Sequence, residues 1–197
     1  LDATGAATYR FDLEWQLAAV PGLAGFGHVH TGSIAAVLEP GGSAVRDTLR
    51  MARATATISY DPNARPTLMG DPSRARRTIE ECVALADVVK VSDEDLAWLR
   101  PGEPVDDVVA EWAELGPPLV VVTRGAQGAQ VRLTRTGETH RAPAPPVTVV
   151  DSVGAGDSFM AGLVSGLLDA GLSGGPDARR RLATADLADV VPALDRA

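Results

Sequence analysis

The segment at 151–171, DSVGAGDSFMAGLVSGLLDAG, combines a glycine-rich turn with acidic residues, a combination that suits a chemical role. It follows a β-branched run at 147–150, which predicts a buried strand, and it turns at Gly154, Ala155 and Gly156. Beyond this turn, apolar residues recur at three- and four-residue steps, as they do in a helix. A glycine-rich turn at a helix start leaves backbone N–H groups without partners. With the positive end of the helix dipole, these groups form an anion site.

Asp157 lies in the first turn of the predicted helix, beside the anion site. On its position alone, a carboxylate there can simply offset the helix dipole. An anion site next to a fixed carboxylate is also what phosphoryl transfer to a hydroxyl requires. The N–H donors stabilise the charge of the phosphoryl group, and the carboxylate accepts the proton of the alcohol.

The residues Asp151–Val164 resemble the second signature of the ribokinase-like (pfkB) carbohydrate kinases, with the pattern of fructokinase-like members. The resemblance implies ATP-dependent phosphorylation of a sugar hydroxymethyl group. It implies that Asp157 is the general base that contacts the sugar, and that the backbone of Gly154–Gly156 is the anion hole. It also implies Mg²⁺ bound to the phosphates of ATP.

Two other segments resemble the nucleotide site of this family. Thr123, Gly125 and Gly128 follow an apolar run and match its T-x-G-x-x-G loop, which implies contacts to ATP. Ser92 and Asp95 stand where the family has an Asn-x-x-Glu motif, which implies ATP contacts for Ser92 and a metal contact for Asp95. Aspartate is one methylene shorter than glutamate, so that metal contact would run through water. The spacing of Ser92 and Asp95 fits a helix capping box equally well.

Arg65 and Asp151 have weaker links to the family. The sequence DPNAR at 61–65 resembles a DPNxR segment of fructokinase-like members, which implies that Arg65 lies near the sugar or the phosphates. The Asp-Pro-Asn turn signal alone fits a plain loop just as well. The family uses the loop at Asp151 for a monovalent cation, so the resemblance implies K⁺ there.

His28, His30 and Cys82 are the other residue types that could bind metal or react. His28 and His30 alternate along a predicted strand at 26–34, so they share a face. No third ligand is near them in the sequence, and we interpret them as hydrogen-bonded strand histidines. Cys82 is the single cysteine, which excludes an internal disulfide and fits a reducing compartment. Its position on the apolar side of a predicted helix favours a place in the core.

Charge and composition limit the partners that we expect. A net charge of −8 opposes nucleic-acid binding, and the arginines at 74–77 and 179–181 are interpreted as solvated helix faces. No apolar run is long enough to span a bilayer and there is no signal-peptide pattern, so we expect no membrane partner and a cytoplasmic location. The expected partner is a small-molecule sugar. Because lids in this family often pair two subunits, the resemblance also implies a homodimer of the full-length protein.

The predicted strands and helices alternate along the chain. Strands are predicted at 6–11, 26–34, 55–60, 87–91, 119–122, 129–134, 138–142 and 147–150, and helices at 42–54, from 72, from 93, at 105–115, from 156 and through Leu182–Leu194. This alternation predicts an α/β fold with a mainly parallel sheet and helices on both faces. We expect one nucleotide-binding domain over residues 1–197.

Both ends look cut, because Leu1 is not a methionine and no cap signal follows the last helix. We therefore expect a piece of a ribokinase-like protein without the N-terminal lid region and the C-terminal end. Two alternatives stay open. One is a kinase of the same fold for a nucleoside or another alcohol. The other is a regulatory module that binds nucleotide without catalysis, which the altered residues Ser92 and Asp95 favour and Asp157 opposes.

Overall fold

The strands of a six-stranded sheet form at the apolar, β-branched runs of the sequence. The computed structural model describes residues 13–18, 20, 22–146, 148, 151 and 153–197. In chain order, the strands are β1 (His28–Gly32), β2 (Thr57–Asp61), β3 (Val88–Ser92), β4 (Leu119–Thr123), β5 (Ala129–Leu133) and β6 (Thr139–Ala142). The predicted strand at 6–11, and 147–150 apart from Thr148, lie outside the described residues.

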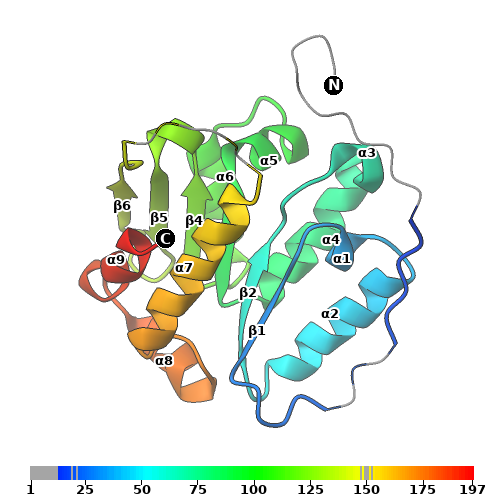
Figure 1. Ribbon diagram of the computed structural model, residues 1–197, viewed down its shortest axis with the longest axis horizontal. Helices are drawn as coiled ribbons and strands as arrows, with labels where there is room; N and C mark the ends of the chain where they lie inside the picture. Colours follow the sequence, from blue (N-terminus) through cyan, green and yellow to red (C-terminus); the bar gives the residue numbers. More distant parts are fainter. Residues whose placement is uncertain (1–12, 19, 21, 147, 149–150, 152) are drawn as a thin grey trace.

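The strands lie side by side in sequence order, from β1 to β6 (Figure 1). The first four are parallel, and β4, β5 and β6 pair as antiparallel neighbours. Because the carboxyl ends of parallel strands share one edge, polar residues that end different strands meet there. The register places Gly32 beside Asp61, and Ser92 beside Thr123.

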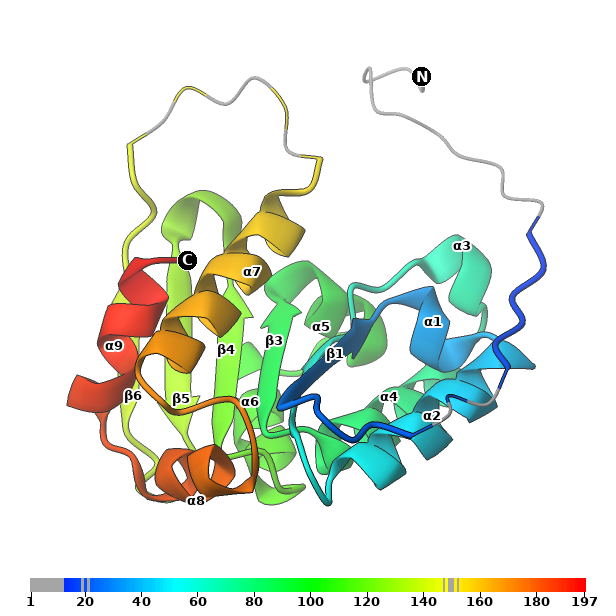
Figure 2. The same cartoon turned by 60° about the horizontal axis from the view of Figure 1, so that its bottom comes forward.

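Helices cover both faces of this sheet, which confirms the predicted fold class (Figure 2). They are α1 (Ile34–Val37), α2 (Gly41–Ala52), α3 (Pro66–Met69), α4 (Pro72–Leu85), α5 (Asp93–Leu99), α6 (Val105–Glu114), α7 (Ala155–Asp169), α8 (Pro176–Thr184), α9 (Leu187–Asp195) and the 3₁₀ helix η1 (Gly125–Gln127). Helices α1 to α6 pack on one face, and α7, α8 and α9 on the other. Alternate residues of β4 divide between the two cores, with Val120 and Val122 in the first and Leu119 and Val121 in the second.

Helix α4 begins at the capping signal read from the sequence. The Asp71 side chain accepts a hydrogen bond from the backbone N–H of Arg74 at 2.9 Å, and Pro72 occupies the first helical position. Such caps satisfy the N–H groups that a helix start leaves free. The predicted start of this helix is therefore confirmed, and Cys82 lies fully buried on its apolar side, also as predicted.

The C-terminal residues form two helices, so the prediction of one helix there is wrong. Helix α8 ends at Thr184, and Ala185 leaves the helical conformation with ψ of 152°. Asp186 then caps α9 in a capping box with Asp189. Because this side chain captures an N–H of the next turn, it starts a new helix where apolar spacing suggested a continuous one.

Arg179 also departs from its prediction. Arg180 and Arg181 are exposed, as expected of a solvated helix face. Arg179 of α8 is instead half-buried, and its Nε donates to Oδ1 of the buried Asp87 at 2.6 Å. The side chain therefore ties α8 to the residue just before β3, a role that position in an arginine run does not reveal.

In the described part of the chain, no helix is both long and apolar enough to cross a membrane.

Candidate active site

The start of α7 lies above the carboxyl edge of the parallel strands (Figure 2). Gly154 caps this helix with a left-handed backbone, φ 78°, which glycine adopts without strain. Its carbonyl accepts the N–H of Ser158 at 2.8 Å, so the helix begins directly after it. Among the described residues, no acceptor faces the N–H groups of Ala155, Gly156 and Asp157. Free amides at a helix start are suited to an anion.

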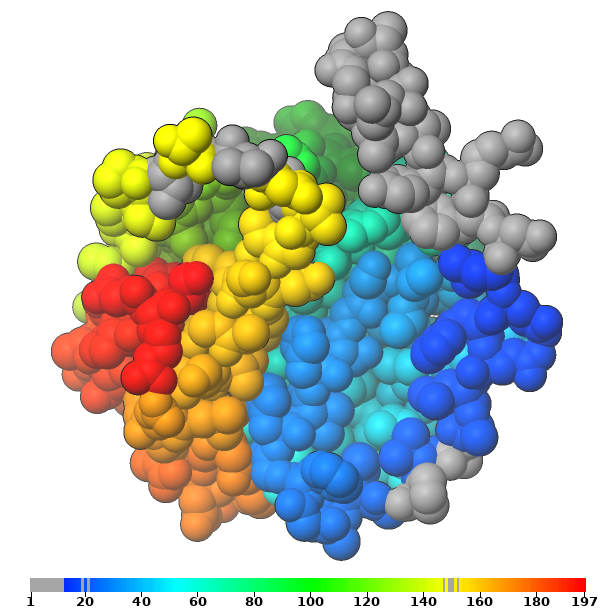
Figure 3. Space-filling view, in the orientation of Figure 1, coloured from blue at the N-terminus to red at the C-terminus, as the bar shows by residue number. Residues whose placement is uncertain are grey.

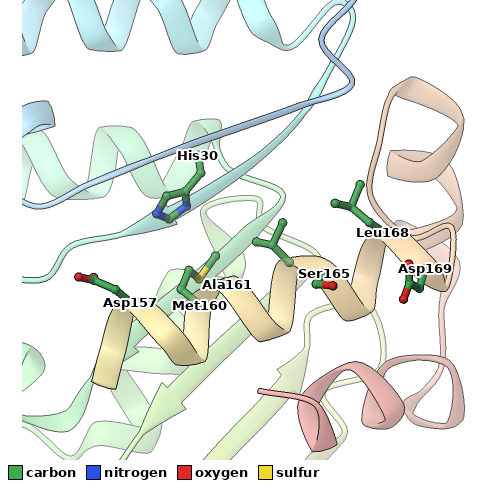
Figure 4. Close-up of a pocket in the computed structure, with 8 residues that line it drawn as sticks. His30, Asp157, Met160, Ala161, Ser165, Leu168 and Asp169 are labelled. Atoms are coloured by element: carbon green, nitrogen blue, oxygen red, sulfur yellow. The ribbon is translucent and has the colours of Figure 1, made fainter. Parts of the chain in front are cut away.

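Asp157 is exposed and lines a pocket of about 590 Å³ along α7. Met160, Ala161 and Val164 continue the pocket wall, and His30 of β1 closes it from the other side. Figure 4 shows the His30 ring above the first turns of α7, and Figure 3 shows α7 and the chain around β1 side by side on one face. Asp157 therefore belongs both to the first turn of α7 and to the wall of a partly apolar pocket.

A chain of hydrogen bonds holds the two histidines of β1. His28 Nδ1 pairs with the hydroxyls of Thr57 at 2.9 Å and Ser173 at 2.8 Å, and its Nε2 pairs with the Ser59 hydroxyl at 2.9 Å. Nδ1 of His30 pairs with the same Ser59 hydroxyl at 2.8 Å. The interpretation as hydrogen-bonded strand histidines is therefore confirmed. No group of three or more metal-binding side chains occurs among the described residues.

The surroundings of both rings favour their neutral forms. Burial, and secondarily the neighbouring His30, lowers the pKa of His28 to about 4. Loss of solvent also lowers the pKa of His30, and the negative charges of Asp61 and Asp157 oppose that shift. Both carboxylates thus act electrostatically on this ring. The pocket itself brings together His30 of β1 and the side chains of α7.

A buried ion pair lies beneath the start of α7. Lys90 Nζ donates to Oδ2 of Asp61 at 2.8 Å, and each side chain is only 4% exposed. Asp61 Oδ1 accepts the backbone N–H of Asn63 at 3.1 Å. Burial raises the pKa of the Asp61 carboxyl, and the charge of Lys90 opposes this shift. A Cβ atom placed on Gly156 would lie 3.0 Å from Lys90 Nζ, so the ammonium lies directly against the helix start.

Ser92 and Asp95 form the capping box that their spacing predicts. Ser92 Oγ accepts the N–H of Asp95 at 3.0 Å, and Asp95 Oδ2 accepts the N–H of Ser92 at 3.4 Å. The other carboxylate oxygen of Asp95 accepts the N–H of Ala64 at 2.8 Å. Both residues lie at the carboxyl edge of the sheet. The capping box therefore holds them at the edge where their predicted contacts to ATP and metal would be made.

Thr123, Gly125 and Gly128 form a tight turn at the same edge. Thr123 ends β4, next to Ser92 of β3. Gly125 opens η1 with φ of 51°, and its carbonyl accepts the N–H of Gly128 at 3.0 Å. The structure thus brings together the three residues of the predicted nucleotide loop and Ser92, which lies 31 positions earlier in the chain.

Arg65 and Asp151 are exposed and make local contacts. The Arg65 guanidinium donates to Asn63 Oδ1 at 2.6 Å and to the Ala64 carbonyl at 2.9 Å, so it folds back onto its own loop. Asp151 Oδ1 accepts the N–H of Val153 at 2.9 Å. Their predicted contacts to sugar, phosphate or K⁺ stay predictions.

Sequence reasoning missed the place of His30 and Lys90 at this site. The sequence pattern predicts only a strand histidine at His30, although its alternation with His28 assigns the two rings to one face. Lys90 was not singled out, although a lysine inside the buried run DVVKV is a signal of its own, since a buried charge requires a partner. Neither of these sequence features indicates that His30 and Lys90 lie next to α7.

The chain matches the family of pfkB family carbohydrate kinases over residues 8–186. It is 38% identical over 183 residues to a fructokinase from Klebsiella pneumoniae, covering 87% of this chain and 58% of that protein. The chain spans about half the length of the curated relatives it matches.

Solved structures agree with this relationship. A double mutant of Vibrio cholerae fructokinase, in its fructose-, ADP- and potassium-bound form, is 28% identical with a TM-score of 0.75, covering 91% of this chain and 55% of that one. An aminoimidazole riboside kinase from Salmonella enterica, complexed with aminoimidazole riboside and an ATP analogue, is 27% identical with a TM-score of 0.68, covering 87% and 53%.

Proposed function

We propose, since this chain belongs to the pfkB family of carbohydrate kinases, that it forms the phosphoryl-transfer part of a sugar kinase. The proposed reaction moves the terminal phosphoryl group of ATP to a sugar hydroxymethyl oxygen, with fructose as the first candidate acceptor. Relatives that are fructokinases support this acceptor. One structural observation carries the proposal. In the described part of the chain, the N–H groups of Ala155, Gly156 and Asp157 at the start of α7 have no acceptor, and the exposed Asp157 carboxylate beside them lines a pocket.

In the proposed mechanism, Asp157 accepts the proton of the acceptor hydroxyl as its oxygen bonds to the terminal phosphorus of ATP. The bond between that phosphorus and the bridging oxygen breaks, and ADP leaves. The backbone N–H groups of the predicted anion hole, Gly154, Ala155 and Gly156, together with that of Asp157, donate hydrogen bonds to the oxygens of the phosphoryl group in transit. Such donors stabilise charge that grows in the transition state, and they need no rearrangement to do so.

Ser92, Thr123, Gly125 and Gly128 are proposed to contact ATP from the carboxyl ends of β3 and β4. This proposal is supported by their side-by-side register and by the turn that the two glycines make. Their edge is also the one above which α7 begins, so a nucleotide lying across it would direct its phosphates toward the free amides. Arg65 is proposed to lie near the sugar or the phosphates, after release from its own loop.

Mg²⁺ and K⁺ are proposed as cofactors. Mg²⁺ usually keeps several waters and uses one or two carboxylates beside the phosphates, and when bound it neutralises phosphate charge. Asp95 fits a contact through water, because each of its carboxylate oxygens already accepts one backbone N–H and keeps a free lone pair. For K⁺ we propose the loop at Asp151, with support from the potassium ion in the Vibrio cholerae structure.

The test compares Asp157→Asn with wild type in the full-length protein. An amide cannot accept the proton, so kcat should fall by at least about 10²-fold while the affinity for ATP stays close to that of wild type. A coupled assay for ADP release and calorimetric titration with ATP measure the two quantities. Asp177→Asn is the matched control, since Asp177 also lies in the first turn of a helix, far from this site. Wild-type turnover in Asp157→Asn would remove this residue from the mechanism.

The acceptor is tested with a panel that holds fructose, other hexoses, ribose and a riboside. A riboside is the second candidate, and the similarity to an aminoimidazole riboside kinase supports it. Binding of ATP without turnover on any acceptor would instead favour a regulatory module. A homodimer and a cytoplasmic location stay predictions for the full-length protein.

A further inference from the structure

Lys90 brings a buried positive charge to the start of α7, and we propose that it is a further positioning residue for phosphoryl transfer. Its ammonium would hold the negative charge of the phosphoryl group against the amides of the helix start. This inference rests on the proposed function, and it adds a residue from β3 that lies outside the glycine-rich segment.

The Lys90 ammonium lies close to the start of α7, which is the first observation that supports the proposal. Lys90 Nζ would lie 3.0 Å from a Cβ atom on Gly156, whose N–H has no acceptor among the residues that the structure describes. The lysine side chain is 4% exposed, so bulk water does little to screen its charge. Charges in such surroundings act more strongly on their neighbours than charges at the surface do. The amides and the ammonium therefore act on an anion at this place together.

The hydrogen bonds of Lys90 carry the second step. An ammonium has three N–H donors. Among the described residues, Lys90 has one acceptor, Asp61 Oδ2 at 2.8 Å. The carboxylate of Asp61 is shared, because its other oxygen accepts the N–H of Asn63. Lys90 thus keeps donor capacity that Asp61 does not use.

The energetics of the pair carry the third step. A cation is disfavoured near the positive end of a helix dipole. Burying an ion pair costs desolvation energy, and an apolar pair of similar size is often at least as stable. Lys90 and Asp61 are therefore costly to keep if they serve the fold alone. A bound phosphoryl group would turn the disfavoured position into a favourable one, since both the helix start and the ammonium attract it.

The competing interpretation is that Lys90 only neutralises Asp61. Replacing Lys90 alone does not separate the two interpretations, because Asp61 would be left buried without its partner and the fold could fail. The paired variant Asp61→Asn with Lys90→Met removes both charges and keeps similar volumes. If neutralisation is the whole role, this variant should behave as wild type does.

The experiment measures binding and turnover of the full-length paired variant beside wild type, with circular dichroism to confirm that both are folded. Calorimetry follows ADP alone, and then ADP with Mg²⁺ and aluminium fluoride, which imitates the phosphoryl group in transit. We expect similar affinity for ADP, affinity for the aluminium fluoride complex lower by about 10²-fold, and a similar fall in kcat without a matching rise in KM for the sugar. Lys90→Arg, which keeps the charge, should recover part of the loss.

Three results overturn the inference. Equal affinity of the paired variant and wild type for the aluminium fluoride complex contradicts it and leaves the kinase proposal intact. If the paired variant loses as much affinity for ADP alone as for the aluminium fluoride complex, the substitutions damage the site in general and Lys90 has no specific role in transfer. A wild-type protein that has neither turnover nor affinity for the aluminium fluoride complex would overturn the kinase proposal, and the role of Lys90 with it.

Discussion

Asp95 accepts a hydrogen bond from the backbone N–H of Ala64 at 2.8 Å, although 31 positions separate the two residues. The other carboxylate oxygen caps α5 by accepting the N–H of Ser92. One side chain therefore joins the start of α5 to the loop that follows β2. That loop follows Asp61, which ends β2 and is the partner of Lys90, so Asp95 holds the chain just after the ion pair beneath α7.

The first prediction follows from this link. Asp95→Ala removes an N-cap interaction and leaves the N–H of Ala64 without its acceptor, so the free energy of unfolding should fall by about 1–3 kcal/mol. Urea denaturation followed by circular dichroism measures it. Glu94→Ala is the control, because Glu94 is an exposed residue of the same helical turn. An equal loss in both variants would contradict the proposed link.

The second prediction concerns the buried carboxylate of Asp87. It accepts hydrogen bonds from Arg179 Nε at 2.6 Å and from the N–H of Ile58 at 2.7 Å. Arg179→Ala leaves a buried charge without its partner, so the free energy of unfolding should fall by about 3–5 kcal/mol. Arg180→Ala breaks only an exposed pair with Asp177 and should change it by about 0.5 kcal/mol or less. Chemical denaturation of both variants tests this, and similar losses would disprove the role of Arg179.

The third prediction is a loss of stability in mild acid. The pKa of His28 is about 4 in the folded protein, whereas an unfolded histidine has a pKa of about 6.5. Between these values the unfolded chain binds more protons, so the free energy of unfolding decreases as the pH falls from about 6.5 toward 4. His30, whose pKa is also lowered, adds to the effect. Urea midpoints at pH 7 and pH 5.5 should differ less in His28→Gln than in wild type. An unchanged difference would rule out His28 as the cause.

The fourth prediction concerns Cys82, which is fully buried in the core. Burial raises the pKa of this thiol to about 12, and only the thiolate reacts with alkylating agents. Iodoacetamide at pH 8 should therefore leave the folded protein unmodified and should label it once guanidinium chloride unfolds it. Mass spectrometry measures the labelled fraction. Rapid labelling of the folded protein would show that the core opens at α4.

The parts of the fold and the site that the sequence predicted are those built from neighbouring residues. The glycine-rich turn at Gly154, Ala155 and Gly156 leads directly into α7, and Ser92 and Asp95 of the capping box are three positions apart. Apolar spacing within one element predicted most strands and helices for the same reason. It could not separate α8 from α9, because a periodic pattern continues across a break that a single capping aspartate makes.

The partners that come from distant segments of the chain depend on the packing of the whole protein. His30 meets Asp157 in one pocket, Lys90 lies against Gly156, and Arg179 reaches Asp87 across 92 positions. Periodicity shows that a strand residue has one of two faces, but the sheet order and the packing of α7 select which helix covers that face. A turn and its cap are encoded by local hydrogen bonds. The neighbours of a buried charge depend on how the whole chain packs, so the sequence alone left them undetermined.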